Sequence, residues 1–220
     1  MIHTLEQVLD PATRATLQAA IERVRFVDGR ATNPGLRTKH NLQVPQNDPG
    51  MEEPGRIVRD ALFRHPGFAR WAVPKTVSRP TISRYEVGMR YGRHSDAPIF
   101  PSTPPMRSDL SCTVFISPPE TYEGGELVLY VGDEALSFKL AAGDAILYPT
   151  EAIHEVRPVT SGVRNVAILW IHSRVQDTRQ REILGRLHGV METVLGGDDE
   201  DLKLEIDYLR SNLTRMWMDV

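Results

Sequence analysis

The chain has 220 residues, a length that suits one sizeable core with at most a small appended subdomain. Apolar residues make up 40% and charged residues 25% of it, the mix of an ordinary globular protein. The formal net charge of −3 provides no basic field for a phosphate backbone, so nucleic acid is not an expected partner. The single cysteine, Cys112, excludes an internal disulfide and a cysteine-based zinc site. It stands in the apolar run LSCTVFI, where we expect it to be buried.

Two further observations concern the location of the protein. No apolar run approaches the roughly 18 residues that a membrane-spanning helix needs. The start MIHTLEQVLDPATR lacks a basic segment followed by an apolar one, so it does not resemble a secretory signal. Together with the single cysteine, these features predict a cytoplasmic protein without a membrane partner.

Residues 1–74 are expected to form helices and a long loop packed on the rest of the chain. In DPATRATLQAAIERV, Asp10 is a plausible N-cap, Pro11 suits the first helical position, and Leu17 and Ile21 share one face. GRIVRDALFRH predicts a second helix. The segment between them, VDGRATNPGLRTKHNLQVPQNDPG, is rich in Gly, Pro and Asn, which indicates a long loop or irregular strand.

Residues 75–175 have a different sequence pattern, in which short apolar or alternating runs are separated by turn residues. The runs are TVSRPTISRYEV, DLSCTVFIS, GELVLYV, ALSFKL, AILYP, HEVRPV and RNVAILWIH. PPETYEGGE, VGDE and AAGD lie between some of them and carry the Gly, Pro and Asp that tight turns need. Several short strands at this spacing predict a mainly β core with flanking helices, a sandwich or barrel of which the jelly roll is one form.

Residues 176–220 are expected to form a C-terminal helical subdomain. TRQREILGRLHGVMETVL and DEDLKLEIDYLRSNLTRMWMDV each carry an apolar stripe at helical spacing, and GGDDED separates them. We interpret the stripes as packing faces, and a homodimer interface through these helices is a further hypothesis from the same pattern. The stripes consist of Ile183, Leu187, Val190 and Val194 in the first segment and Leu202, Ile206, Leu209, Leu213 and Met216 in the second.

The first candidate metal ligands occur in YGRHSDAPIF, where one residue separates His94 from Asp96. On an extended segment such residues point to the same side, so the imidazole and the carboxylate can converge on one ion. His154, at the start of a predicted strand, adds a second imidazole. Two imidazoles and one carboxylate form the facial triad that suits Fe(II) and leaves coordination positions open. Zinc is the competing metal, because the same ligand types occur in hydrolytic zinc sites.

Arg164 bears on the choice between these metals. It opens the strand RNVAILWIH, in which its alternating neighbours Val166, Ile168 and Trp170 are apolar. Burying an unpaired charge is unfavourable, so an arginine on this face implies an anionic partner, and a guanidinium fork suits a carboxylate. Two partners remain open at this point. One is an Asp or Glu elsewhere in the chain, and the other is the distal carboxylate of 2-oxoglutarate, whose other end chelates iron.

The pattern of His94, Asp96, His154 and, ten residues later, Arg164 resembles the Fe(II)/2-oxoglutarate-dependent dioxygenases of the prolyl-hydroxylase-like branch. Within that branch it is most similar to the bacterial PKHD-type hydroxylases. The likeness runs nearly end to end, through FVDGRAT, NLQVP, RYEVGMRYGRHSDAPI, RSDLSCTVFIS, YEGGELVL, LAAGDAILYP, HEVRPVTSGVR and NLTRMWMDV. It implies a double-stranded β-helix (a jelly roll) with flanking helices. It also implies His94, Asp96 and His154 as iron ligands and Arg164 as the 2-oxoglutarate clamp.

The resemblance extends to neighbours of the clamp. It implies Tyr85 as a hydroxyl donor to the same co-substrate carboxylate, and Leu127 fits the wall of the co-substrate pocket. Prolyl hydroxylases often have a second tyrosine where this chain has Phe115, which has no hydroxyl to donate. The clamp is therefore expected to rest on Arg164 and Tyr85.

Candidate substrate contacts are Asn41, Arg84 and Arg107, which fall in segments shared with the PKHD type. A structural salt bridge, such as one between Arg107 and Asp109, explains an arginine there equally well. The long segments 28–55 and 97–107 are expected to wall the substrate cleft. The other five histidines lack partners at ligand spacing and are interpreted as non-ligands: His3, His40, His65, His172 and His188.

The implied reaction is hydroxylation of an unactivated C–H bond with Fe(II), 2-oxoglutarate and O₂, releasing succinate and CO₂. Its substrate, a protein or peptide residue or a small molecule, does not follow from the sequence. L-Ascorbate is a further cofactor that the resemblance suggests. Two alternatives remain open. A zinc hydrolase on a cupin-like barrel leaves Arg164 unexplained, and a non-catalytic module would sense iron or 2-oxoglutarate without turnover.

Overall fold

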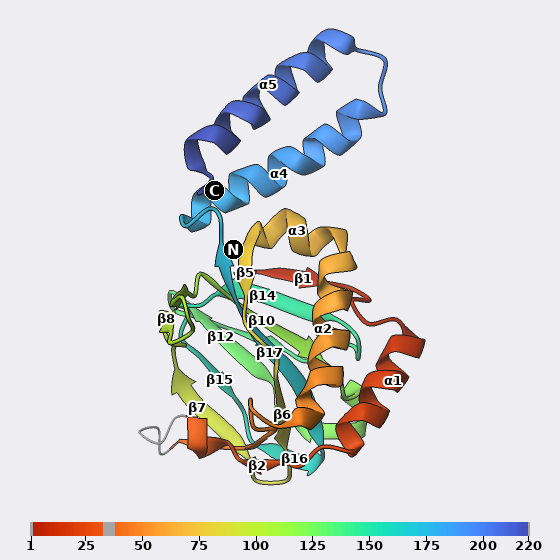
Figure 1. Cartoon of the computed structure of the whole chain (residues 1–220), viewed down its shortest axis with the longest axis vertical. Coiled ribbons are helices and arrows are strands. Elements are labelled where there is room, and N and C mark those ends of the chain that lie inside the picture. The colour runs from red at the N-terminus through yellow and green to blue at the C-terminus, as the bar shows by residue number, and fades with distance from the viewer. Residues whose placement is uncertain (1, 33–37, 220) are drawn as a thin grey trace.

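The computed structural model describes residues 2–32 and 38–219, and the predicted long loop falls partly outside these ranges, at 33–37. Two β-sheets face each other, and helices cover the outer face of the larger one (Figure 1). In the larger sheet the order is β1 (His3–Leu5), β14 (Ala145–Pro149), β10 (Leu110–Phe115), β17 (Arg164–Ser173), β6 (Thr81–Tyr85), β4 (Leu42–Gln43) and β2 (Val27–Asp28), with β5 (Pro74–Val77) also paired to β17.

The smaller sheet supplies the opposite wall. Its order is β13 (Glu134–Phe138), β12 (Leu127–Val131), β15 (His154–Val156), β7 (Arg90–His94) and β3 (Lys39–His40). Two short pairs complete the β structure: β11 (Tyr122–Gly124) with β16 (Val159–Gly162), and β8 (Ile99–Phe100) with β9 (Met106–Arg107). The expectation of a mainly β core with flanking helices is confirmed.

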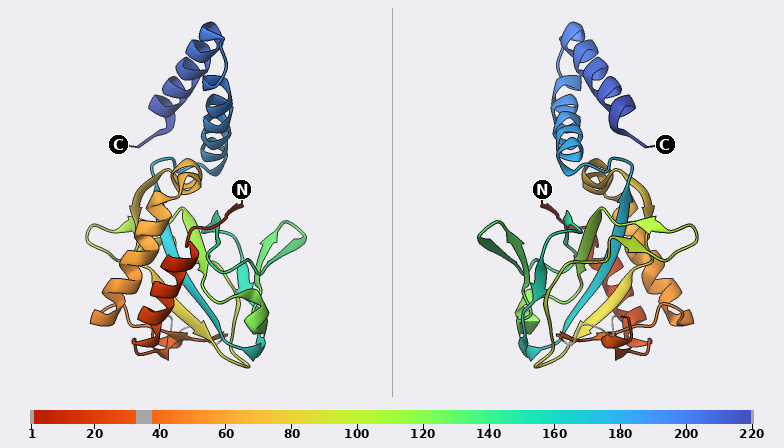
Figure 2. Two further views of the ribbon diagram at one scale, coloured as in Figure 1. Left: turned by 90° about the vertical axis from the view of Figure 1, so that its right-hand side faces the viewer. Right: turned by 90° about the vertical axis from the view of Figure 1, so that its left-hand side faces the viewer.

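Three helices pack on the outer face of the larger sheet, as Figures 1 and 2 show: α1 (Pro11–Glu22), α2 (Glu52–Arg64) and α3 (Pro66–Ala72). The start of α1 is as predicted, because the Asp10 carboxylate accepts a hydrogen bond from the Thr13 N–H at 2.8 Å. Leu17 of α1 and Phe68 of α3 join Cys112 of β10 in one buried cluster. The three-part division of the chain stays a prediction, since residues on both sides of position 74 share this core.

A second apolar cluster fills the space between the two sheets. Strand β17 contributes to both clusters by alternation: Ala167 and Leu169 face the helices, whereas Val166 and Ile168 face the smaller sheet. Arg164 has the same parity as Val166. The period of two therefore directs this guanidinium into the space between the sheets.

The last two helices, α4 (Thr178–Leu195) and α5 (Glu200–Trp217), form a hairpin that projects from the rest of the molecule (Figures 1 and 2). Helix α4 packs against α3, and a Cβ added at Gly185 would lie 2.4 Å from the Trp71 ring. Helix α5 has no buried residue. The prediction of packing faces is therefore wrong for much of both stripes. Their exposed members are Ile183, Val190, Leu202, Leu209 and Met216.

Among the elements that the structure describes, α4 is the one that makes extensive contact with α5, so a stripe on α5 can be periodic and still remain in solvent. Among the helices that the structure describes, none is both long and apolar enough to cross a bilayer.

Candidate active site

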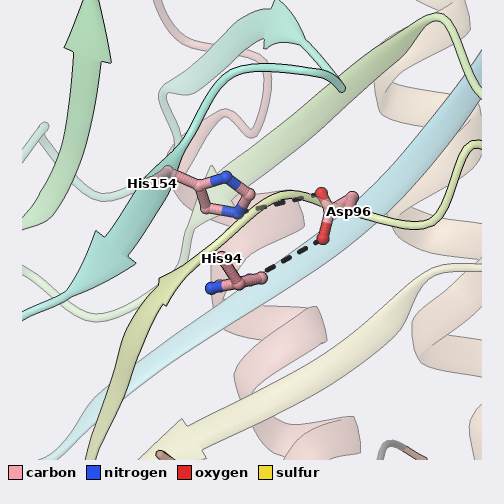
Figure 3. Close-up of side chains that lie close together, drawn as sticks. All are labelled: His94, Asp96 and His154. Atoms are coloured by element: carbon pink, nitrogen blue, oxygen red, sulfur yellow. Dashed lines mark ion pairs between the residues drawn. The ribbon is translucent and has the colours of Figure 1, made fainter. Parts of the chain in front are cut away.

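His94, Asp96 and His154 meet in the space between the two sheets (Figure 3). His94 ends β7 and pairs with His154 at the start of the neighbouring β15. The Nε2 atom of His94 lies 3.8 Å from Asp96 Oδ1, and the Nε2 atom of His154 lies 3.8 Å from Asp96 Oδ2. One ligand atom from each residue lies within 4.8 Å of the other two, which is compatible with a single metal ion.

Hydrogen bonds hold all three side chains in the orientation that a metal needs. The Nδ1–H of His94 donates to the Gly92 carbonyl at 2.8 Å, and that of His154 donates to the Ala152 carbonyl at 2.9 Å. Each Nε2 is thereby left with its lone pair directed at Asp96. Asp96 Oδ2 accepts a hydrogen bond of 2.7 Å from the Ser111 hydroxyl.

The surroundings keep the first imidazole neutral. The side chains of His94 and His154 are each 5% exposed, and Tyr91 stacks on His94 with ring centroids 3.6 Å apart. Burial, with a further contribution from the nearby His154, lowers the pKa of His94 to about 4. A neutral imidazole is the form that binds a metal, so the donor set fits a divalent ion such as Fe(II).

A cavity of about 450 Å³ opens beside these residues. All six residues predicted to bind the metal or the co-substrate line it. They are His94, Asp96, His154, Arg164, Tyr85 and Leu127. Phe100, Pro101 and Ser102 also line the cavity, in agreement with the predicted role of segment 97–107 as a wall of the cleft.

Arg164 is 1% exposed, yet its Nε and Nη1 atoms have no hydrogen-bond partner. Among the residues that the structure describes, no Asp or Glu forms an ion pair with it. The internal partner considered from the sequence is therefore absent from this part of the chain. A buried guanidinium without an anion is unfavourable, and an anionic ligand in the cavity would correct this.

The local sequence makes room for the guanidinium and surrounds it with aromatic rings. A Cβ at Gly125 would lie 2.9 Å from Arg164 Cδ, and Gly125 has a φ of +68°, which also favours glycine. The guanidinium carbon is 5.1 Å from the Tyr85 ring centroid and 5.5 Å from that of Phe115. The Tyr85 hydroxyl is buried without a hydrogen bond of normal geometry, and burial raises its pKa to about 12, although the nearby Arg164 and Asn41 lower it. It therefore keeps its proton and remains a donor.

Phe115 is buried beside the Arg164 guanidinium, where the resemblance placed it, and it has no hydroxyl to donate. Sequence reasoning did not identify Tyr122, which comes from the neighbouring β11. Its hydroxyl is buried without a hydrogen bond of normal geometry. Burial raises the pKa of Tyr122, while the nearby Arg164 lowers it.

The three candidate substrate contacts do not line the cavity. Asn41 is 1% exposed, and its amide has no partner. Arg84 lies over the Phe26 ring at 4.0 Å and donates to Asn165 Oδ1. Arg107 pairs with Asp109 at 2.7 Å, the salt bridge considered as its alternative.

Lys39 and Gln43 line the cavity and were missed. Together with Asn41 they occupy alternate positions of KHNLQ, and all three are buried. The signal was this alternation, which is polar and so escapes a search for apolar periodicity. Burial lowers the pKa of the Lys39 ammonium to about 8, while the attraction of Asp96 opposes that shift.

The comparisons with known proteins agree with this geometry. Residues 80–172 match the model of the 2OG-Fe(II) oxygenase superfamily. The chain is 37% identical to a PKHD-type hydroxylase of Stenotrophomonas maltophilia, with 100% of both chains covered. In fold it is similar to a prolyl-4-hydroxylase of Pseudomonas putida (TM-score 0.55, 17% identity, 79% of this chain and 92% of that one). It is also similar to a prolyl hydroxylase of Trichoplax adhaerens (TM-score 0.57, 17% identity, 83% of this chain and 86% of that one). These neighbours have the jelly-roll core that the sequence implied.

Proposed function

The chain belongs to the PKHD-type hydroxylases of the 2OG-Fe(II) oxygenase superfamily, and on this premise we propose that His94, Asp96 and His154 bind its iron. The protein is a dioxygenase that uses Fe²⁺, 2-oxoglutarate and O₂ to hydroxylate a substrate that is not yet identified. Family membership sets aside the zinc hydrolase and the non-catalytic sensing module. The observation that supports the assignment best is the convergence of two Nε2 atoms and one carboxylate in a lined cavity.

Arg164 and Tyr85 are proposed to bind the distal carboxylate of 2-oxoglutarate, with Leu127 as an apolar wall. The support is the pair of buried, unpartnered donors in one cavity, a guanidinium and a protonated phenol. When bound, iron and 2-oxoglutarate supply the oxidising chemistry. The protein's own residues orient the two ligands and surround them with apolar side chains such as Val156 and Val166, which exclude water.

The remaining partner assignments are finer and stay predictions. The contacts observed for Arg84 and Arg107 support structural roles for them, and Asn41 is not among the residues that line the cavity. L-Ascorbate, the cytoplasmic location and the lack of a nucleic-acid partner are likewise predictions. The homodimer hypothesis is supported by the exposed apolar residues of α4 and α5, which a second copy would cover.

The test is anaerobic addition of Fe(II) and 2-oxoglutarate, followed by O₂. The intact chain should give the weak visible charge-transfer band of the iron·2-oxoglutarate complex, and then succinate. His94→Ala should give neither signal, because one of three ligands is lost. Arg164→Met should weaken the band at a given 2-oxoglutarate concentration. Arg186→Met is the matched control, since Arg186 is exposed on α4 and pairs with Glu182. An absent band in the intact chain, or an unchanged one in Arg164→Met, would contradict the assignment.

A further inference from the structure

With iron and 2-oxoglutarate bound as proposed, the side chains that line the cavity would still carry an excess of positive charge. Among the described residues that line it, Asp96 is the one acid, whereas Lys39, Arg79 and Arg164 are all cationic. The two carboxylates of 2-oxoglutarate and Asp96 together carry three negative charges. The two charges of Fe(II) and the charge of Arg164 match them. Lys39 and Arg79 therefore remain as cations that neither the metal nor the co-substrate requires.

Lys39 is built into the cavity wall. Strand β3 pairs Lys39 with Tyr91 of β7, and β4 pairs Gln43 with Ser83 of β6. The segment from 39 to 43 thus crosses from the smaller sheet to the larger one and borders the cavity between them. Lys39 is 4% exposed in spite of its charge. A lysine is seldom this deeply buried, so its place in the wall of a polar cavity is unusual.

The ammonium group is held close to the metal ligands. Lys39 Nζ donates to Gln43 Oε1 at 3.2 Å, and Gln43 in turn donates to the Ser83 hydroxyl at 3.1 Å. The same Nζ lies 5.3 Å from the centroid of the Tyr91 ring, and this ring also stacks on the His94 imidazole. One aromatic ring therefore separates this cation from a proposed iron ligand. A group bound at Lys39 would place its adjoining carbon atoms beside the reaction centre.

Arg79 adds positive charge further out. It is exposed, and it lines both the cavity and a neighbouring groove along α2. Its side chain forms no hydrogen bond or ion pair with any residue in the ranges that the structure describes. Opposite charge attracts a ligand on its way to the site, so both cations favour an anion.

We propose that Lys39 binds a carboxylate of the primary substrate, and that this hydroxylase therefore acts on a carboxylic acid. The proposal rests on the proposed function and adds the substrate class to it. One ammonium with a primary amide beside it matches a singly charged carboxylate better than a doubly charged phosphate, which takes several donors. The apolar Phe100, Ile168 and Trp170 line the same cavity and suit the hydrocarbon part of such a molecule.

The experiment uses a panel of N-acetyl-amino acids, each paired with its carboxamide, on the full chain with Fe(II) and saturating 2-oxoglutarate. Affinities are measured anaerobically by calorimetry, and succinate formation is measured after O₂ is admitted. At least one acid should bind about 10-fold or more tightly than its amide, the discrimination expected of a hydrogen bond to a charged group. The charge-transfer band should persist during the titration, which separates binding at Lys39 from displacement of 2-oxoglutarate at Arg164.

Three variants test whether Lys39 is the residue that binds the substrate carboxylate. Lys39→Met should remove the preference for the acid, Lys39→Arg should keep it, and Lys203→Met on α5 should leave it unchanged. A panel in which no acid binds more tightly than its amide overturns the proposal, as does an undiminished preference in Lys39→Met. In both cases an intact band and basal succinate formation show that the proposed function stands. A wild-type chain without the band overturns the proposed function and this inference together.

Discussion

The cavity between the sheets and the hairpin of α4 and α5 depart from ordinary burial in opposite directions. In the cavity, charged and polar groups lie in the interior, and Arg164 is 1% exposed without an ion-pair partner among the described residues. On the hairpin, apolar groups lie in solvent, and Leu204 and Met216 are each 72% exposed. A buried unpaired charge and an exposed apolar patch are both unfavourable in an isolated chain.

The buried charges of the cavity specify a binding partner more closely than the exposed apolar residues of the hairpin do. A buried guanidinium and a triad of donors specify their ligands, because charge, donor type and distance must all match. An apolar helix face indicates only that something covers it, since the hydrophobic effect is not directional. The cavity therefore supports an assigned chemistry, whereas the hairpin supports only the hypothesis of a second copy.

The largest expected effect comes from removing a proposed metal ligand. His94→Ala should lower succinate formation on the order of 100-fold or more, since even outer partners of metal ligands contribute 10- to 100-fold. Metal content after dialysis should fall in parallel, while the melting temperature of the metal-free chain stays close to that of the wild type. His188→Ala is the control, because His188 is exposed on α4. Full metal content in His94→Ala would remove His94 from the ligand set.

The next prediction separates ligand binding from stability at one residue. Arg164→Met should weaken 2-oxoglutarate binding by about 1.5 to 3 kcal/mol, roughly 10- to 100-fold, because a charge-assisted hydrogen bond is lost. The same variant should stabilise the ligand-free chain by about 1 to 4 kcal/mol, because a buried unpaired charge is replaced by an apolar side chain. Denaturant unfolding without ligand measures the second effect. A less stable variant would show that Arg164 has an internal partner.

Much of the site could be predicted from sequence because its signals are local. The period of two in a strand places His94 and Asp96 on one side, and the same period makes Arg164 conspicuous among apolar residues. The register that sets His154 beside His94 is a property of paired strands, so the sequence offered His154 as a third ligand without specifying which strand lies next to it. For the fold, turn residues marked most of the strands, and a capping residue marked the start of α1.

What could not be predicted depends on contacts between distant segments. Lys39 enters the cavity because the segment from 39 to 43 crosses from one sheet to the other, and nothing within KHNLQ specifies that crossing. The apolar stripe of α5 shows which residues share a face but not whether another element reaches that face. Arg84 and Arg107 resemble site residues in sequence, yet Arg84 lies over the Phe26 ring and Arg107 pairs with Asp109.

A smaller effect is expected at the hydrogen bond that orients the carboxylate. Ser111→Ala removes the 2.7 Å contact to Asp96 Oδ2 and should lower metal affinity by about 10- to 100-fold. Ser137→Ala on β13, at an exposed position, is the matched control and should bind metal like the wild type. Competition for iron with a colorimetric chelator measures both affinities. Equal affinity in the two variants would mean that Asp96 is held in place without Ser111.

The smallest expected effect lies on the hairpin. Leu204→Gln and Met216→Gln should each change the free energy of unfolding by no more than about 0.5 kcal/mol, since both side chains are already in solvent. Leu169→Ala in the core should by contrast reduce it by about 2 to 5 kcal/mol. The homodimer hypothesis adds a second readout, because light scattering should then give about twice 24.8 kDa for the wild type and 24.8 kDa for the double hairpin variant. A wild-type monomer would leave the exposed apolar residues of the hairpin without a second copy to cover them. A large loss of stability in the single variants would instead mean that these side chains are covered in solution, by a second copy if the wild type is a dimer and by the chain itself if it is a monomer.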